Sequence, residues 1–218
     1  SLCDWSSDVC SSDLGKDLFE NSTLARLRYE EANQIMGMDL ATLSFEGPEE
    51  ELRQTEFTQP AIFMVSVILN EMLIESGTVP SFSVGHSLGE YSALTASGVF
   101  NFADALVLVK LRGELMRRAG REKKGTMAAV LGLSDKVVSE LCVDACQNGE
   151  VAVPANFNSP GQIVISGSIK AVRRAMELAD KAGAKKTVEL NVSGAFHSPL
   201  MSSAKHAMLE ALEATELN

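Results

Sequence analysis

The stretch Gly85-His86-Ser87-Leu88-Gly89 constrains the chain more than any other. A serine flanked by glycines follows the extended apolar run Phe82–Val84 and precedes the helix-like segment Leu88–Ser97. In a Gly-x-Ser-x-Gly corner, a sharp turn exposes the serine oxygen at a helix N-terminus, where the next backbone N–H can face an oxyanion. Both glycines are expected because side chains there would collide with the neighbouring strand or helix. An ordinary turn with a capping serine remains the alternative.

The composition is that of a soluble globular protein. The chain has 218 residues, of which 45% are hydrophobic and 22% charged, so one large domain, or a domain with an insert, is expected. The apolar run AIFMVSVILNEML is interrupted by Ser66, Asn70 and Glu71, which favours a buried helix over a membrane span. A net charge of −10 argues against general nucleic-acid binding, because phosphates would be repelled.

The cysteines indicate neither a disulfide framework nor a metal site. There are four, and they are scattered. Cys142 and Cys146 lie one turn apart on a predicted helix, but no histidine or further cysteine pair completes a tetrahedral set. We therefore expect this pair to pack in a core, no metal, and a reducing cytoplasm.

The chain changes style twice along its length. Residues 1–14, SLCDWSSDVCSSDL, repeat Ser-Ser-Asp without helical or strand periodicity, and we interpret them as a foreign appendage. Residues 15–124 and 193–218 alternate predicted helices and strands, as around a parallel sheet. Within this body we expect one helix to open at Thr58-Gln59-Pro60 and a long one over Asn101–Ala119.

Residues 125–192 are predicted to form a small inserted subdomain. TMAAVLGL, VAVPANFN, GQIVISG and KKTVELNV are typical of strands, and two helical segments lie between them. The resulting order βαββαβ is that of a ferredoxin-like unit. The chain then returns to the body as a helix with Ser198 as its cap and Pro199 in its first turn.

A serine hydroxyl becomes a nucleophile only when a base takes its proton, and three histidines are available. His86 is adjacent to Ser87, where side chains diverge on a sharp turn, and His206 lies off the apolar stripe of the last helix. His197 follows a predicted strand and precedes a helix start, a position from which loops deliver catalytic groups. A capping role is its alternative. Asp135, Asp144 and Asp180 are unconvincing third members, so a backbone or amide oxygen is the expected partner of the histidine.

Arg112 is predicted to lie on an apolar helix face, beside Leu108, Val109, Leu115 and Met116. A buried guanidinium keeps its charge and calls for an anion. The partner is either an internal carboxylate or, next to an activated serine, a substrate carboxylate held by two parallel hydrogen bonds. The basic run RRAGREKK that follows is either a solvated helix end or a docking site for an acidic partner or for phosphates.

Four blocks together resemble one family. GHSLGEYSAL, KLRGELM, ANFNSPGQIVISG and GAFHSPLM, in this order and spacing, are similar to the malonyl-CoA:acyl-carrier-protein transacylases of fatty acid synthesis, from Gly15 to Asn218. The resemblance implies an α/β-hydrolase-like parallel-sheet body with a ferredoxin-like insert. It also implies ping-pong transfer of malonyl from malonyl-CoA to acyl carrier protein, by a cytoplasmic monomer without a resident cofactor, nucleic acid or membrane.

The resemblance also implies roles for individual residues. Ser87 would be the acylated nucleophile, His197 the base, the Leu88 N–H an oxyanion donor and Arg112 the clamp on the malonyl carboxylate. Four further residues would line the pocket: Gln59, Met116, Asn156 and Phe196, the last favouring malonyl over methylmalonyl.

The family pattern is incomplete at both ends of the sequence. A first strand with a Gly-Gln-Gly-Ser-Gln loop, which supplies relatives with a second oxyanion N–H, would be expected before Gly15. A segment that orients the histidine would be expected after Asn218. Three alternatives therefore stay open: an acyltransferase domain of a polyketide synthase, a serine esterase or thioesterase, and an inactive fragment that binds carrier protein.

Overall fold

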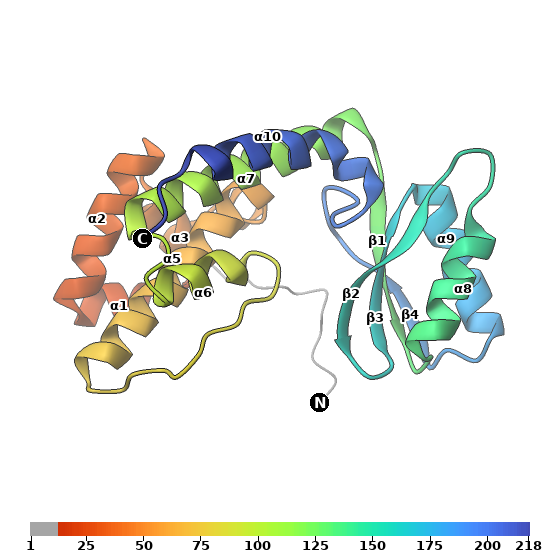
Figure 1. Ribbon diagram of the computed structural model, residues 1–218, viewed down its shortest axis with the longest axis horizontal. Helices are drawn as coiled ribbons and strands as arrows, with labels where there is room; N and C mark the ends of the chain where they lie inside the picture. The colour runs from red at the N-terminus through yellow and green to blue at the C-terminus, as the bar shows by residue number, and fades with distance from the viewer. Residues whose placement is uncertain (1–12) are drawn as a thin grey trace. The chain divides into compact units, whose positions relative to one another are not determined.

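The computed structural model describes residues 13–218, so the interpretation of residues 1–14 as an appendage falls almost wholly outside the described residues. The chain divides into two compact units (Figure 1). We call the described residues up to Glu114, with Ala207–Asn218, the helical unit, and Leu115–His206 the sheet unit. The sequence-based division at residues 125 and 192 stays a prediction.

The helical unit is built from helices around one apolar core. Tyr29, Phe63, Ile68 and Leu106 are fully buried in it, and the rings of Phe19, Tyr29 and Phe45 contact one another edge-on or tilted. Its elements are α1 (Lys16–Asn21), α2 (Thr23–Met36), α3 (Leu40–Glu46), α4 (Glu49–Leu52), α5 (Thr55–Glu75), α6 (Gly89–Ala96), the first part of α7 (Phe102–Glu122) and the last part of α10 (Ser202–Ala214).

Helix α5 begins one turn earlier than the sequence predicted. It starts at Thr55 and contains Pro60 in its interior, whereas the proline had been expected in the first turn. Length and composition would allow α5 to cross a membrane, and it is the single such helix among the described residues. The core helix of a soluble protein passes the same test, and α5 buries Phe63, Met64, Val67 and Ile68 in the helical core, as expected of a buried helix.

The predicted strand Phe82–Val84 is not present. Residues 78–85 run extended (Figure 1), but no strand pairs with them in the described part of the chain. Val79, Phe82 and Val84 are 77%, 82% and 86% exposed. A strand is stabilised by hydrogen bonds to a neighbouring strand, and within residues 13–218 no parallel sheet supplies one. The expectation of a parallel sheet is therefore not met in these residues.

The sheet unit contains the six elements expected between residues 125 and 192. They are β1 (Thr126–Leu131), α8 (Asp135–Ala145), β2 (Ala152–Ser159), β3 (Gln162–Gly167), α9 (Ile169–Lys181) and β4 (Lys186–Glu189), followed by the 3₁₀ turn η1 (Pro199–Met201). Ser198 caps η1 by accepting a hydrogen bond from the Leu200 N–H at 3.3 Å. Ser198 is thus a cap, as predicted, but of the 3₁₀ turn that precedes α10 and not of α10 itself.

The four strands form one antiparallel sheet in the order β2-β3-β1-β4. In the register, Ala128 pairs with Ile165 and Val130 with Ile163. Because side chains alternate between the faces of a strand, these four point to one face. There they form a core with the buried sides of α8 and α9, which cover the same face (Figure 1). Cys142 belongs to this core, as predicted. Cys146 is exposed at the end of α8, so the prediction that both cysteines pack in a core is wrong for Cys146.

Candidate active site

Ser87 occupies a strained corner immediately before α6. Its φ is +54°, a left-handed conformation that is uncommon for any residue with a Cβ. Gly85 makes the corner possible, because a Cβ on it would lie 2.0 Å from the carbonyl carbon of Gly89 and 2.1 Å from the amide nitrogen of Glu90. Gly89 is different, since an added Cβ would meet nothing within 4 Å. The expected collision is therefore confirmed at Gly85 and wrong at Gly89.

The start of α6 directs a backbone donor into the corner. The N–H groups of Gly89, Glu90 and Tyr91 donate to the carbonyls of His86, Ser87 and Leu88. The Leu88 N–H has no acceptor among the described residues, although the Leu88 side chain is buried. A free N–H beside a serine at a helix N-terminus is the arrangement that stabilises an oxyanion.

The Arg112 guanidinium lies against the serine. One of its terminal nitrogens, Nη2, donates to Ser87 Oγ at 3.1 Å, and Nη1 donates to Oε1 of Gln59. The guanidinium carbon lies 5.8 Å from the centre of the Tyr91 ring, within cation–π range. Within residues 13–218 no carboxylate is hydrogen-bonded or ion-paired to Arg112. The hydrogen bonds that this half-buried cation donates to Gln59 and Ser87 therefore go to neutral groups.

Burial acts on both ionisable groups of this cluster. It lowers the pKa of Arg112, while the charges of Tyr91 and Glu90 oppose the shift. The guanidinium nevertheless stays protonated at neutral pH, because its ordinary pKa lies above 12. Burial also raises the pKa of Tyr91, so the phenol stays neutral. The cluster therefore carries a positive charge in a partly desolvated place, next to a hydroxyl.

Sequence reasoning missed two members of this cluster, Thr55 and Tyr91. Thr55 Oγ1 accepts a hydrogen bond from Gln59 Nε2 at 2.7 Å, and Tyr91 stacks on Phe100 with ring centres 6.4 Å apart. The spacing of Thr55 and Gln59, one helical turn apart, indicates a contact between their side chains if both lie on the helix. A helix that begins at Thr58, as predicted, does not include Thr55.

The other predicted site residues belong to the sheet unit. Met116 lies on α7 and Asn156 on β2, opposite Val164 and next to a register shift. Phe196 is half-buried, and His197 is in the left-handed region with φ +58°. Apart from Ser87 and His197, Asn148 is the one other non-glycine residue with positive φ in the described chain. Such backbone strain is concentrated at functional positions.

Of the other two histidines, His206 is exposed on α10, as expected, and its Nδ1 lies 2.9 Å from the Ser202 carbonyl oxygen. His86 is also exposed. In the described part of the chain no cluster of three or more potential metal-binding side chains occurs. The chemistry available here is that of a serine, a backbone N–H and a guanidinium.

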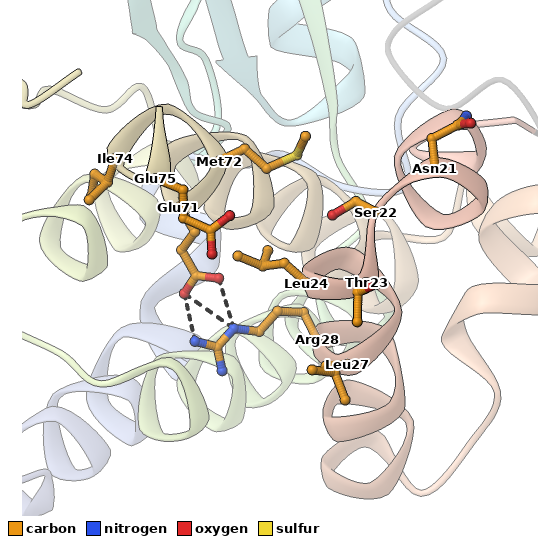
Figure 2. Close-up of a pocket in the computed structure, with 10 residues that line it drawn as sticks. All are labelled: Asn21, Ser22, Thr23, Leu24, Leu27, Arg28, Glu71, Met72, Ile74 and Glu75. Atoms are coloured by element: carbon orange, nitrogen blue, oxygen red, sulfur yellow. Dashed lines mark hydrogen bonds and ion pairs between the residues drawn. The ribbon is translucent and has the colours of Figure 1, made fainter. Parts of the chain in front are cut away.

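A separate pocket of the helical unit lies between the start of α2 and the end of α5 (Figure 2). The arginine in its lining already has carboxylate partners. Arg28 donates to Glu71 through two nitrogens at 2.7 and 2.9 Å and to Glu31 at 2.7 Å. Hydrogen bonding to Glu71 raises the pKa of Arg28. A second pocket, in the sheet unit, is lined by Lys185, Lys186 and the loops around Gly132 and Gly161. Neither contains a nucleophile with an activating group.

Comparison with known proteins places the chain in a family. The family model described as "Acyl transferase domain" matches residues 13–218. The malonyl CoA-acyl carrier protein transacylase of Bacillus subtilis is 43% identical over 204 residues, which cover 94% of this chain and 64% of that protein. The chain therefore spans slightly less than two thirds of the length of that relative.

Two solved structures have the same fold. A malonyl-transacylase in complex with a type II polyketide synthase acyl-carrier protein superposes with a TM-score of 0.90 at 41% identity, covering 96% of this chain and 69% of that chain. The malonyl-CoA:acyl carrier protein transacylase of Xanthomonas oryzae gives 0.87 at 44% identity, covering 92% and 64%. The chain belongs to the acyl transferase domain family, as its four sequence blocks predicted.

Proposed function

We propose that this chain carries malonyl from malonyl-CoA to the phosphopantetheine thiol of an acyl carrier protein, by way of a malonyl ester on Ser87. The observation that carries the proposal is Arg112, a half-buried cation whose hydrogen bonds go to neutral groups, with Nη2 3.1 Å from Ser87 Oγ. An uncharged acyl group would offer the guanidinium no hydrogen-bonded counter-charge, whereas a malonyl carboxylate would pair with it.

The proposed reaction uses Ser87, His197 and the Leu88 N–H. Ser87 Oγ attacks the thioester carbonyl carbon while His197 accepts the hydroxyl proton, and the Leu88 N–H stabilises the oxyanion. The carbon–sulfur bond then breaks, and coenzyme A leaves with the proton from His197. In the second half, His197 deprotonates the carrier thiol, which attacks the malonyl ester and regenerates Ser87. Gln59, Met116, Asn156 and Phe196 are proposed to line the acyl pocket.

The same proposal includes a finer architecture and a partner. We infer a ferredoxin-like subdomain, supported by the strand order β2-β3-β1-β4 with both helices on one face, on an α/β-hydrolase-like body. The solved complex of a related transacylase with its carrier protein supports an acyl carrier protein as partner. A cytoplasmic monomer, with no bound cofactor, remains part of the expectation.

The direct test is intact-mass spectrometry after brief exposure to malonyl-CoA. A malonyl adduct is expected on the unchanged chain and not on Ser87→Ala. The variant Arg112→Ala should lose preference for malonyl-CoA over acetyl-CoA. Equal labelling by both thioesters in the unchanged chain would contradict the proposal, as would faster cleavage of uncharged esters, which would favour an esterase. A polyketide synthase domain would share this chemistry.

A further inference from the structure

We infer that Thr55 is a positioning residue that sets the acyl-group preference of the serine site by fixing the orientation of the Gln59 amide. This inference rests on the proposed function. It starts from a continuous set of polar contacts, all within the helical unit, that joins Thr55 to the nucleophile. Thr55 Oγ1 accepts from Gln59 Nε2 at 2.7 Å, Gln59 Oε1 accepts from Arg112 Nη1, and Arg112 Nη2 donates to Ser87 Oγ at 3.1 Å.

Each contact in this set has a direction imposed by chemistry. A guanidinium has donors only, so the Gln59 atom that faces Arg112 must be the amide oxygen. The amide nitrogen then points the other way and needs an acceptor. Gln59 is 5% exposed, so water is a poor substitute there. The hydroxyl oxygen of Thr55 is the acceptor that the nitrogen meets.

Without that acceptor the Gln59 amide nitrogen loses its hydrogen bond to Thr55, and the orientation that keeps the amide oxygen toward Arg112 becomes less stable. A rotated amide would turn its N–H groups toward the guanidinium, and two sets of donors would repel. Arg112 would then lose one of its two oxygen acceptors, Gln59 Oε1, and the plane of its guanidinium would no longer be held in one orientation. A bidentate grip on a carboxylate depends on that direction.

The local sequence explains why the contact forms. Thr55 is the first residue of α5, and the preceding Gln54 makes no side-chain capping bond. Residues four apart face each other on a helix, so Thr55 and Gln59 meet as soon as the helix begins at Thr55. Gly113 packs against the same turn, because a Cβ on it would lie 2.7 Å from the Cα of Glu56. This close packing holds the turn against the helix that carries Arg112.

The substitution that tests the inference is Thr55→Val, which keeps the branched shape and removes the acceptor. Thr55→Ser keeps the hydroxyl and is the matched rescue variant. The readout is the ratio of Ser87 acylation rates with malonyl-CoA and acetyl-CoA, followed by intact mass, with thermal unfolding measured on the same samples. We expect the malonyl rate to fall about three- to tenfold in Thr55→Val, as for loss of one hydrogen bond, with the acetyl rate unchanged. Thr55→Ser should restore the ratio.

The outcomes separate this inference from the proposal on which it rests. A malonyl adduct on the unchanged chain with the same malonyl-to-acetyl ratio in Thr55→Val would overturn the positioning role alone. An equal fall in both rates would also overturn it, since a purely structural role affects both substrates alike. If Ser87 of the unchanged chain takes no malonyl group, the proposed function fails and the inference fails with it.

Discussion

Extended segments of the helical unit and of the sheet unit differ in how far their apolar side chains are exposed. In the sheet unit, strands β1 and β3 bury Val130, Ile163 and Ile165 to 1% exposure or less, and each strand has a partner. In the helical unit, the extended residues 78–85 expose Val79, Phe82 and Val84 almost fully. Ser87 comes two residues after this segment. The paired, buried strands of the sheet unit and the corner that carries Ser87 thus have different kinds of backbone support.

The difference shows how the corner is held although, in the described part of the chain, no strand pairs with the segment that precedes it. One contact comes from the Ser83 hydroxyl, which donates to the Ala93 carbonyl of α6 at 2.9 Å. Another is the close approach of Gly85 to the first residues of that helix. The third is the Arg112 donor on Ser87 itself. The strained φ of Ser87 is therefore maintained by helix contacts within the helical unit.

The largest effect is expected from Gly85→Ala. Its Cβ would overlap backbone atoms of Gly89 and Glu90 at 2.0–2.1 Å, and backbone cannot move aside as a flexible side chain can. We expect loss of Ser87 acylation and a fall in the unfolding free energy of at least about 3 kcal/mol. Mass spectrometry and urea denaturation measure the two effects.

Gly89→Ala is the matched control for that substitution. It adds the same methyl group to the other glycine of the motif, into open space, at the first residue of α6. We expect no loss of stability, and a gain of up to about 1 kcal/mol from helix propensity. If both variants lost acylation and stability equally, the conclusion that close packing requires a glycine at Gly85 but not at Gly89 would be wrong.

A pair of valines compares the two units directly. Val130 is 1% exposed on β1 and Val84 is 86% exposed on the extended segment. Val130→Ala should lower the unfolding free energy by about 2–3 kcal/mol through lost burial and a cavity. Val84→Ala should change it by less than about 0.5 kcal/mol. Similar losses in urea denaturation would mean that another surface covers the extended segment in solution.

The same contrast explains what the sequence could predict. The helices and strands of the sheet unit between residues 125 and 192 were predicted correctly, because local signals such as the apolar runs of β1 and β3 mark them. The strand at Phe82–Val84 has an equally apolar run. A strand also needs a neighbour, however, and no local pattern reveals whether one is present.

The site residues also fall into those that a local sequence pattern predicted and those that depend on packing. Ser87 and Arg112 were predicted from the corner motif and from a charge on an apolar helix, and the structure brings both together with Gln59. Thr55 and Tyr91 were missed, since their contacts depend on where α5 begins and on how α6 packs beside α7. The roles assigned to His197, Met116, Asn156 and Phe196 stay predictions.

The ion pair in Figure 2 allows a comparison of one ion pair in each unit, for which smaller effects are expected. Arg28 joins α2 to Glu71 of α5, and the two side chains are only 30% and 24% exposed. Arg28→Met should cost about 1–2 kcal/mol in unfolding free energy, because charged hydrogen bonds between helices are lost. Lys136→Met in the sheet unit is the control. Its pair with Glu140 spans 3.9 Å at 86% and 62% exposure, so a change near zero is expected. Equal costs would contradict this ranking.

The smallest effect concerns the sheet unit at high pH. Burial raises the pKa of Cys142 from 9.0 to about 12. The folded state therefore favours the neutral thiol. Its contribution to stability is complete below pH 9 and is lost as the pH rises from about 9 toward 12. We expect a loss on the order of 1 kcal/mol at pH 10 relative to pH 8, measured by urea denaturation.

Cys142→Val removes the titrating group while keeping the side chain apolar, so its stability should fall less between pH 8 and pH 10 than that of the unchanged chain. Cys146, which is exposed at the end of α8, supplies the second half of the test. Peptide mapping after brief alkylation at pH 8 should find Cys146 modified well before Cys142, because the thiolate is the reactive form. Equal alkylation would mean that the core of the sheet unit opens as readily as the surface, and the contrast between the two units would not hold on that timescale.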